Sequence, residues 1–262
     1  MRVSPFAYLE QKDVGLPPIP AGIPQESNIL FRYEDVATNF TGSVWNDTSG
    51  LGYTTATLIN GSGDLSSGSL QTNPRSGKVL VETNTNIDVK SVVVLFNTWK
   101  AYTTSGANRD YFWDMRDAGV DNSGYFNQND SVATGASTLF GNDGEYYSYD
   151  ETDGTVTGPQ LTTPANLTNG TGNSAGGTAT SQFLGPNGKL AYYPKRMWHF
   201  NFNSTSPLGI RTTAEGAYFG SNDSGLESSP LAYFSIIGWS VALTSTEVDE
   251  LVAYYKAQGV LS

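Results

Sequence analysis

The sequence predicts an all-β fold, a two-sheet antiparallel sandwich, and two observations lead to this prediction. Short β-prone runs alternate with turn clusters along most of the chain. No repeating strand–helix unit appears, which argues against an open parallel sheet. At 262 residues, the chain is long enough for one large sandwich and a tail, and a second complete domain would be crowded. We therefore expect one sandwich domain over residues 29–262, preceded by an extended proline-rich arm over residues 1–28.

The arm is predicted from its prolines. Between Ser4 and Ser27 the chain carries Pro5, Pro17, Pro18, Pro20 and Pro24. Proline favours extended or polyproline-like backbone and excludes a regular helix. The apolar residues Leu16, Ile19 and Ile23 lie between these prolines, and they favour docking on another surface over the alternative, a disordered leader.

The predicted strands are runs rich in β-branched and aromatic residues. In chain order they cover residues 29–33, 78–82, 91–96, 110–115, 144–149, 197–202, 217–220 and 231–239. Turn signals such as Asn60-Gly61 and Asn73-Pro74 separate some of them. Residues 154–185 are mostly Thr, Gly, Asn and Ser, and this composition predicts a long loop or a poorly ordered insertion.

One helix is predicted near the end of the chain, over residues 245–258. Thr244-Ser245-Thr246-Glu247 matches a capping box, in which the Thr244 hydroxyl accepts a bond from a backbone amide and Glu247 reaches back to the cap. The residues that follow at the spacing of one helical face are Val248, Leu251, Val252 and Tyr255. Gly259 can end the helix in a left-handed turn. We expect this helix to pack on the sandwich.

Composition and charge exclude several function classes. The chain has 14 Lys and Arg against 25 Asp and Glu, a net charge of −11, so no nucleic-acid partner is expected, because that affinity comes mainly from cationic side chains. No run approaches about 18 consecutive apolar residues, and the first residues lack the apolar core of a secretory signal, so no membrane association is expected. Cysteine is absent, which excludes disulfides and thiolate zinc sites.

Four segments, in this order, carry a resemblance to a known family. They are Trp45 to Gly52 (WNDTSGLG), Tyr111 to Arg116 (YFWDMR), Trp198 to Phe200 (WHF) and Tyr218 to Tyr255, which ends in the predicted helix. Together they resemble the laminin-G-like, concanavalin A-like jelly-roll domains, particularly the divergent versions in structural proteins of bacteriophages and large viruses. The resemblance covers roughly residues 29–262. It implies a jelly-roll topology with a lectin-like sandwich.

No catalytic residue is predicted. Laminarinase relatives on a similar sandwich carry Glu-x-Asp-x-x-Glu, and Glu151-Thr152-Asp153 begins this pattern but reaches Val156 where the second Glu should stand. His199 is the only histidine, so a histidine-based triad or a two-histidine metal site within one chain would depend on it or cannot exist. We expect a structural role for His199. The chain is therefore predicted not to be an enzyme, and a polysaccharide-active enzyme is the weaker alternative.

Aromatic and acidic clusters supply the candidate binding residues. Aromatic faces can stack on sugar rings, and the carbohydrate candidates are Tyr146, Tyr147, Tyr149 and Asp150. Core packing is the alternative for these tyrosines. Carboxylate oxygens suit Ca²⁺, and the calcium candidates are Asp143, Glu145 and Asp153. Solvated turn carboxylates are the alternative there, because no calcium loop of fixed spacing is present, and no other cofactor is predicted.

The resemblance, the acidic composition and the absence of cysteine lead to one predicted function. It is a non-enzymatic structural protein of a virion, such as a capsid decoration, fibre or minor capsid component. Its partners would be neighbouring capsid or tail subunits, contacted through the arm at residues 1–28, in a homo-oligomer or larger assembly. The alternative is a carbohydrate-binding or adhesion module on a virus or cell surface, with glycans as partners and an extracellular or cell-surface location.

Overall fold

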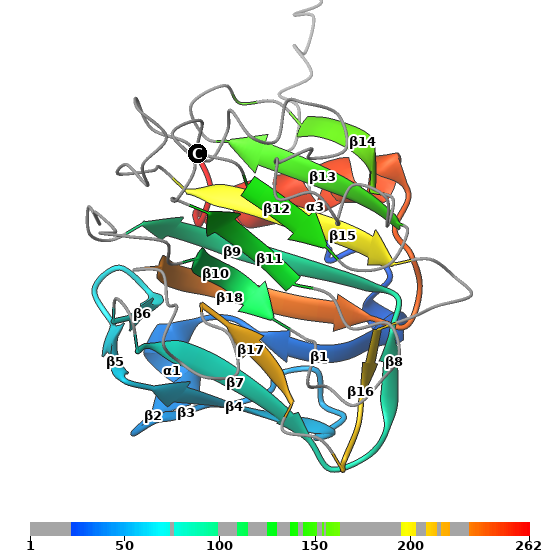
Figure 1. Cartoon of the computed structure of the whole chain (residues 1–262). Coiled ribbons are helices and arrows are strands. Elements are labelled where there is room, and N and C mark those ends of the chain that lie inside the picture. The colour runs from blue at the N-terminus through cyan, green and yellow to red at the C-terminus, as the bar shows by residue number, and fades with distance from the viewer. Residues whose placement is uncertain are drawn as a thin grey trace, which may run out of the picture.

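The computed structural model describes residues 22–73, 76–98, 109–114, 125–129, 137–140, 144–150, 154, 156–162, 195–202, 208–213, 216–220 and 231–262. This part of the chain is mostly β (Figure 1), with two eight-stranded sheets and one two-stranded sheet. The described strand pairs are antiparallel. The all-β class and the antiparallel pairing predicted from the sequence are confirmed.

The first sheet contains the longest strands. Its spatial order is β14 (Val156–Thr162), β13 (Gly144–Asp150), β15 (Arg196–Phe202), β9 (Ser91–Thr98), β18 (Leu231–Trp239), β6 (Ser69–Thr72) and β5 (Gly61–Asp64), and β1 (Ile29–Tyr33) also pairs with β18. The prediction of a loop over residues 154–185 is wrong at residues 156–162, which form strand β14. Among the described strands, only β13 pairs with β14, and the pairing contains a register shift. Edge strands and bulges tolerate a proline such as Pro159. Residues 163–185 lie outside the described part of the chain.

The second sheet is built from shorter strands. Its order is β12 (Ser137–Phe140), β11 (Tyr125–Asn129), β10 (Arg109–Asp114), β17 (Ala217–Phe219), β7 (Lys78–Thr83), β4 (Thr54–Ile59), β3 (Val44–Trp45) and β2 (Phe40–Thr41). A separate pair joins β16 (Leu208–Ile210) to β8 (Ile87–Val89). The helical elements are η1 (Glu26–Asn28), α1 (Val36–Asn39) and α3 (Ser245–Ala257).

Two hydrophobic clusters lie on the two faces of the first sheet, and strand β9 shows how they are divided. Val92 and Val94 belong to the cluster between the two sheets, whereas Val93 and Leu95 belong to the cluster under α3. Successive side chains of a strand point to opposite faces. Because both faces are buried, β9 is a nearly continuous apolar run. Figure 1 shows α3 lying across the strands of the first sheet.

Helix α3 confirms the prediction for the end of the chain. Its capping box is present, with the Glu247 amide donating to Oγ1 of Thr244 at 3.3 Å and the Thr244 amide donating to Oε2 of Glu247 at 2.7 Å. Its buried residues are Val248, Leu251, Val252, Tyr254 and Tyr255. Gly259 follows with φ 70°, the left-handed conformation that favours glycine. Among the helices in the described residues, none is long and apolar enough to cross a membrane.

The end of the predicted arm packs on the domain. Ile23 is buried in the cluster under α3, and Nε1 of Trp239 donates a 3.0 Å hydrogen bond to the Pro24 carbonyl. Gln25 contacts Glu247 in the first turn of α3. The described residues of the arm therefore belong to the packed structure, and residues 1–21 lie outside the described part of the chain.

Candidate functional site

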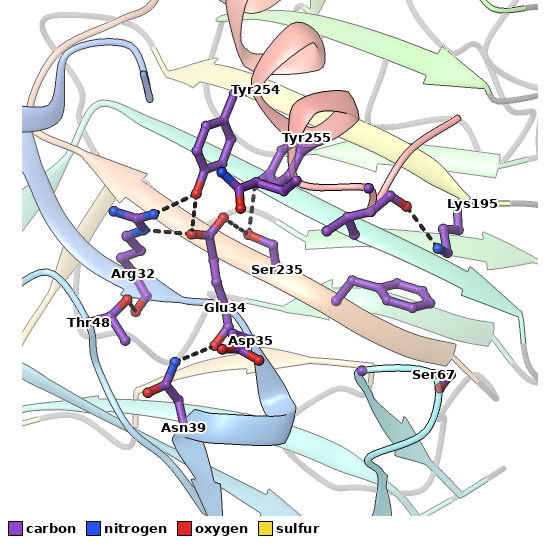
Figure 2. Close-up of a pocket in the computed structure, with 15 residues that line it drawn as sticks. Arg32, Glu34, Asp35, Asn39, Thr48, Ser67, Lys195, Ser235, Tyr254 and Tyr255 are labelled. Atoms are coloured by element: carbon purple, nitrogen blue, oxygen red, sulfur yellow. Dashed lines mark hydrogen bonds and ion pairs between the residues drawn. The ribbon is translucent and has the colours of Figure 1, made fainter. Parts of the chain in front are cut away.

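A cavity of about 480 Å³ lies beside β1, β18 and the C-terminal end of α3 (Figure 2). We name it the α3 pocket and define it by Arg32, Glu34, Asp35, Lys195, Phe234 and Tyr254. Its volume falls within the range of about 300–1,000 Å³ that is typical of small-molecule sites. Charged groups, hydroxyls and amides line it together with aromatic rings, so it is equipped to bind a polar ligand.

Strand β1 and the residue after it place two opposite charges on one side: Arg32 lies in β1 and Glu34 directly follows the strand. Arg32 and Glu34 are two residues apart, so their side chains point to the same side of the strand. Phe31 and Tyr33 point to the other side and are buried between the two sheets. The end of β1 is therefore apolar toward the sandwich core and charged toward α3, whereas Ile29 at its start packs in the cluster under α3.

A bulge in β18 forms the neighbouring wall. Tyr233 pairs with Phe96 and Ser235 pairs with Leu95, so Phe234 is the extra residue. A bulge redirects side chains locally. As a result, Phe234 and Ser235 both face α3: Phe234 packs in the cluster under the helix, and Oγ of Ser235 lies 2.7 Å from the Tyr255 hydroxyl.

The charged pair is held in a network of four side chains (Figure 2). Nε of Arg32 lies 2.6 Å from Oε2 of Glu34. The Tyr254 hydroxyl donates to the same carboxylate oxygen at 2.9 Å and accepts from Nη2 of Arg32 at 2.5 Å. Ser235 donates to Oε1 of Glu34 at 3.3 Å. Each side chain therefore fixes another, and Glu34, which is only 13% exposed, keeps its charge compensated.

The electrostatics of this network set the protonation states. Burial lowers the pKa of Arg32, but the Glu34 carboxylate and its hydrogen bond outweigh burial, and the pKa is raised overall. Burial, reinforced by the charge of Glu34, raises the pKa of Tyr254 to about 12. At neutral pH, Tyr254 is thus a neutral hydrogen-bond donor and not a phenolate nucleophile.

The opposite side of the pocket carries a lysine against the C-terminal segment. Nζ of Lys195 donates a 2.8 Å hydrogen bond to the Val260 carbonyl and lies 4.7 Å from the centre of the Phe234 ring, within the range of a cation–π contact. The ammonium group has three donors, and among the described residues only one of them is used, so two can serve a ligand or water.

Asp35 stands at the start of α1 in an unusual conformation. Its φ and ψ are 47° and 70°, and its side chain makes no capping hydrogen bond to the helix. Left-handed backbone is uncommon outside glycine, although Asp and Asn tolerate it best. Within the described residues, the Asp35 carboxylate is exposed and has no hydrogen-bond or ion-pair partner.

The structure places two of the four predicted carbohydrate-binding residues in the core. Tyr147 and Tyr149 are 3% and 1% exposed, and the Tyr149 hydroxyl donates to the Ser262 carbonyl at 3.0 Å. Neither ring offers a face to a sugar, which agrees with the alternative that these two tyrosines pack in the core. Tyr146 and Asp150 lie on β13, but their side chains lie outside the described part of the structure.

The calcium candidates lie mostly outside the described residues. This is so for Asp143 and Asp153 and for the side chain of Glu145, which lies on β13. In the part of the chain that the structure describes, no group of three or more His, Asp or Glu side chains could hold a metal ion. A calcium site stays a prediction.

His199 lies in the core, away from the α3 pocket. It is fully buried, its Nε2 lies 2.9 Å from Oδ1 of Asn201, and its ring packs between Tyr147 and Trp239. The Asn201 amide in turn donates to the Leu243 carbonyl. This environment supports the structural role expected for His199.

Sequence reasoning missed Arg32 and Glu34. A signal was present, because two opposite charges stand at alternate positions of the otherwise apolar run Ile29-Leu30-Phe31-Arg32-Tyr33 and the residue after it. Such spacing predicts a charged strand face. The partners of this face come from β18 and α3, some 200 residues later in the chain, and no local pattern links them.

Comparisons with known proteins give only distant similarity. No family and no curated protein matches the sequence. A solved structure of Trypanosoma rangeli sialidase has a TM-score of 0.46 at 11% identity, over 94% of this chain and 36% of the sialidase. The structure of that sialidase in complex with sialic acid has a TM-score of 0.39 at 11% identity, over 94% of this chain and 36% of the sialidase. A mutant of the Trypanosoma rangeli sialidase displaying trans-sialidase activity has a TM-score of 0.40 at 12% identity, over 92% of this chain and 35% of the mutant. This chain thus spans about a third of those proteins.

These comparisons correct two of the predictions made from the sequence. The prediction of a non-enzymatic structural protein of a virion is contradicted, because these three structures are of a sialidase and not of a virion protein. The classification as a non-enzyme is contradicted by the same finding. Because the TM-scores are below 0.5, the similarity assigns neither an activity nor a site residue to this chain, and its function is argued from the α3 pocket.

Proposed function

We propose that this chain binds a saccharide in the α3 pocket. The observation that carries the proposal is the fixed network of Arg32, Glu34 and Tyr254. It forms one side of a cavity that is otherwise lined with both hydrogen-bond donors and acceptors and with apolar groups. A sugar hydroxyl both donates and accepts hydrogen bonds. A pocket of mixed donors and acceptors on rigid strands suits such a ligand, because the orientation of each group is set before binding.

Spare hydrogen-bonding capacity supports the proposal. Nη1 of Arg32 has a distant ion pair with Glu26, at 3.8 Å, on a side chain that is 73% exposed, so it can exchange that contact for a ligand oxygen. With respect to the described residues, Lys195 keeps two donors and the Asp35 carboxylate keeps its acceptors. Gln258 is a further polar lining residue, and the lining also contains Asn39, Thr48 and Ser67, whose side chains already make hydrogen bonds within the protein. The guanidinium, the ammonium and the amides donate, and the carboxylate and the hydroxyls accept.

We also propose that the two large sheets form a concanavalin A-like jelly roll. In support, the first strand of the domain, β1, lies beside the last, β18, and the two sheets enclose a common apolar cluster. Lectins are among the proteins that use such sandwiches, but a fold does not fix a function. The saccharide proposal therefore depends on the pocket.

The test is a glycan array followed by calorimetric titration of the glycans that bind. Gln258→Ala removes an exposed lining amide whose side chain has no partner in the described structure, and it should weaken binding about two- to tenfold, the effect of one hydrogen bond. Glu34→Gln should weaken binding more than tenfold, since it also releases Arg32. Glu82→Gln, an exposed carboxylate on β7 away from the pocket, is the matched control and should leave binding unchanged.

The outcomes separate clearly. Failure to bind any glycan, or an equal affinity of the Gln258→Ala, Glu34→Gln and wild-type chains, would overturn the proposal. Glu34→Gln removes one charge of an ion pair, so its fold is checked by near-ultraviolet circular dichroism before titration. Release of free sugar from each bound glycan, followed over time in the same samples, shows whether binding leads to cleavage.

A further inference from the structure

The charges of the α3 pocket are not equally compensated. Arg32 and Glu34 neutralise each other at 2.6 Å. Lys195 is bonded to the Val260 carbonyl and lies over the Phe234 ring, so a carbonyl dipole and the negative ring face offset part of its charge. The Asp35 carboxylate has no compensating partner within the described residues. Lys195 keeps its positive charge on the opposite side of the pocket, and Asp35 is the acidic lining residue whose charge has neither an ion-pair nor a hydrogen-bond partner among the described residues.

The backbone indicates that Asp35 is held there at a cost. A non-glycine residue at φ 47° and ψ 70° has a strained backbone, and such strain often marks functional positions. The position precedes α1, where an Asp normally caps the helix through its side chain, but no capping bond is made. Figure 2 shows Asp35 below Glu34 and near Asn39 in the pocket lining. The helix cap therefore does not account for the carboxylate.

We infer that Asp35 makes the α3 pocket selective for uncharged saccharides by repelling sugars that carry a carboxylate or sulfate. This inference rests on the proposed function. Specificity often comes from a repulsive group as well as from attractive contacts, and the net charge of −11 on the chain adds a long-range repulsion of anions. Sugar hydroxyls, in contrast, can donate to the same carboxylate.

The experiment uses matched oligosaccharide pairs that differ only in a terminal hexose or the corresponding hexuronate, in the glucose, galactose and mannose series. The wild-type chain should bind the neutral member more tightly. Asp35→Asn keeps a residue that tolerates left-handed backbone and removes the charge. This variant should bind the hexuronate about three- to tenfold more tightly than the wild-type chain at low salt. Its affinity for the neutral sugar should change less than about threefold. The tighter binding of the hexuronate should disappear at high salt, where charges are screened.

The control is Asp249→Asn, which makes the same charge change at an exposed position of α3 outside the pocket lining. It should leave the preference for the neutral sugar intact. Tighter binding of the hexuronate by the wild-type chain, or no gain in Asp35→Asn, would overturn the inference while the saccharide site stands. Absence of binding to every neutral and acidic sugar would instead overturn the proposed function, and the inference with it.

Discussion

The hydroxyl of Tyr254 donates a 2.9 Å hydrogen bond to Oε2 of Glu34, two residues that are 220 positions apart in the sequence. The bond joins the residue that directly follows β1 to helix α3, and Arg32 of β1 donates to the same hydroxyl at 2.5 Å. One phenol therefore bridges both members of the ion pair. The shape of the α3 pocket and the attachment of α3 depend on the same contact.

Tyr254→Phe removes this bridge without removing the ring. Hydrogen bonds to charged groups stabilise folded proteins by about 1.5–3 kcal/mol, and we expect the free energy of unfolding to fall by about this amount. Urea unfolding provides the measurement. Tyr53→Phe is the matched control, because the Tyr53 hydroxyl has no partner in the described structure, and it should cost less than about 0.5 kcal/mol. Equal losses in the two variants would show that the bridge does not stabilise the fold.

Much of the fold could be predicted because its determinants are local. The runs at Ile29–Tyr33 and Leu231–Trp239 are strands with the predicted bounds. Helix α3 begins at the predicted residue and ends one residue early, because a capping box and an apolar stripe lie within a few residues of each other. Strand β14 was missed because its Gly, Pro and Thr content is typical of a loop, and pairing with β13 outweighs this local preference.

The candidate site was harder to predict for a physical reason. The pocket needs the bulge at Phe234, which aligns Ser235 with Glu34, and a bulge depends on the register between β18 and β9, not on residues close in sequence. The aromatic cluster at Tyr147 and Tyr149 was a stronger local signal, but α3 covers it. Long-range packing thus buried Tyr147 and Tyr149 and left the α3 pocket open.

Strand β18 leaves no room for a side chain at Gly238. A Cβ atom there would lie 2.4 Å from Cζ of Phe31, on the neighbouring strand. Gly238→Ala should therefore lower the free energy of unfolding by about 1–3 kcal/mol through overpacking. Gly22→Ala, where nothing lies within 4 Å of the added atom, is the control. In Phe31→Leu, the same Gly238→Ala change should cost clearly less, and an undiminished cost in that background would contradict the clash.

Leu251 tests how α3 is held. It is fully buried in the cluster between α3 and the first sheet, and an isolated helix of this length is marginal in water. Leu251→Ala should cost about 2–5 kcal/mol, the range for truncating a buried Leu. Leu65→Ala makes the same change at a residue that is 57% exposed and should cost less than about 0.5 kcal/mol. Denaturant unfolding of both variants decides, and similar small losses would mean that the helix contributes little to stability.

His199 should make the stability of the domain depend on pH. Burial lowers its pKa to about 4, from the ordinary value of 6.5, and the bond to Asn201 offsets only part of this effect. Nδ1 has no hydrogen-bond partner among the described residues, so the imidazole is buried in its neutral form. Between pH 6.5 and pH 4 the unfolded chain binds a proton that the folded chain does not. Stability contributed by the neutral ring is therefore complete above pH 6.5 and is lost as the pH falls toward 4.

The expected loss is about 3 kcal/mol across this window, because each pKa unit corresponds to about 1.4 kcal/mol. His199→Gln preserves a hydrogen-bond donor for Asn201 and has no side chain that titrates. The difference in unfolding free energy between the wild-type and variant chains should therefore change with pH over this range. The contributions of all other titrating groups are the same in both chains and cancel in this difference. Since the sequence has a single histidine, one imidazole resonance in a nuclear magnetic resonance titration reports its pKa directly. A midpoint near 6.5 in the folded protein, or parallel pH profiles for the two chains, would show that the ring is not buried in its neutral form.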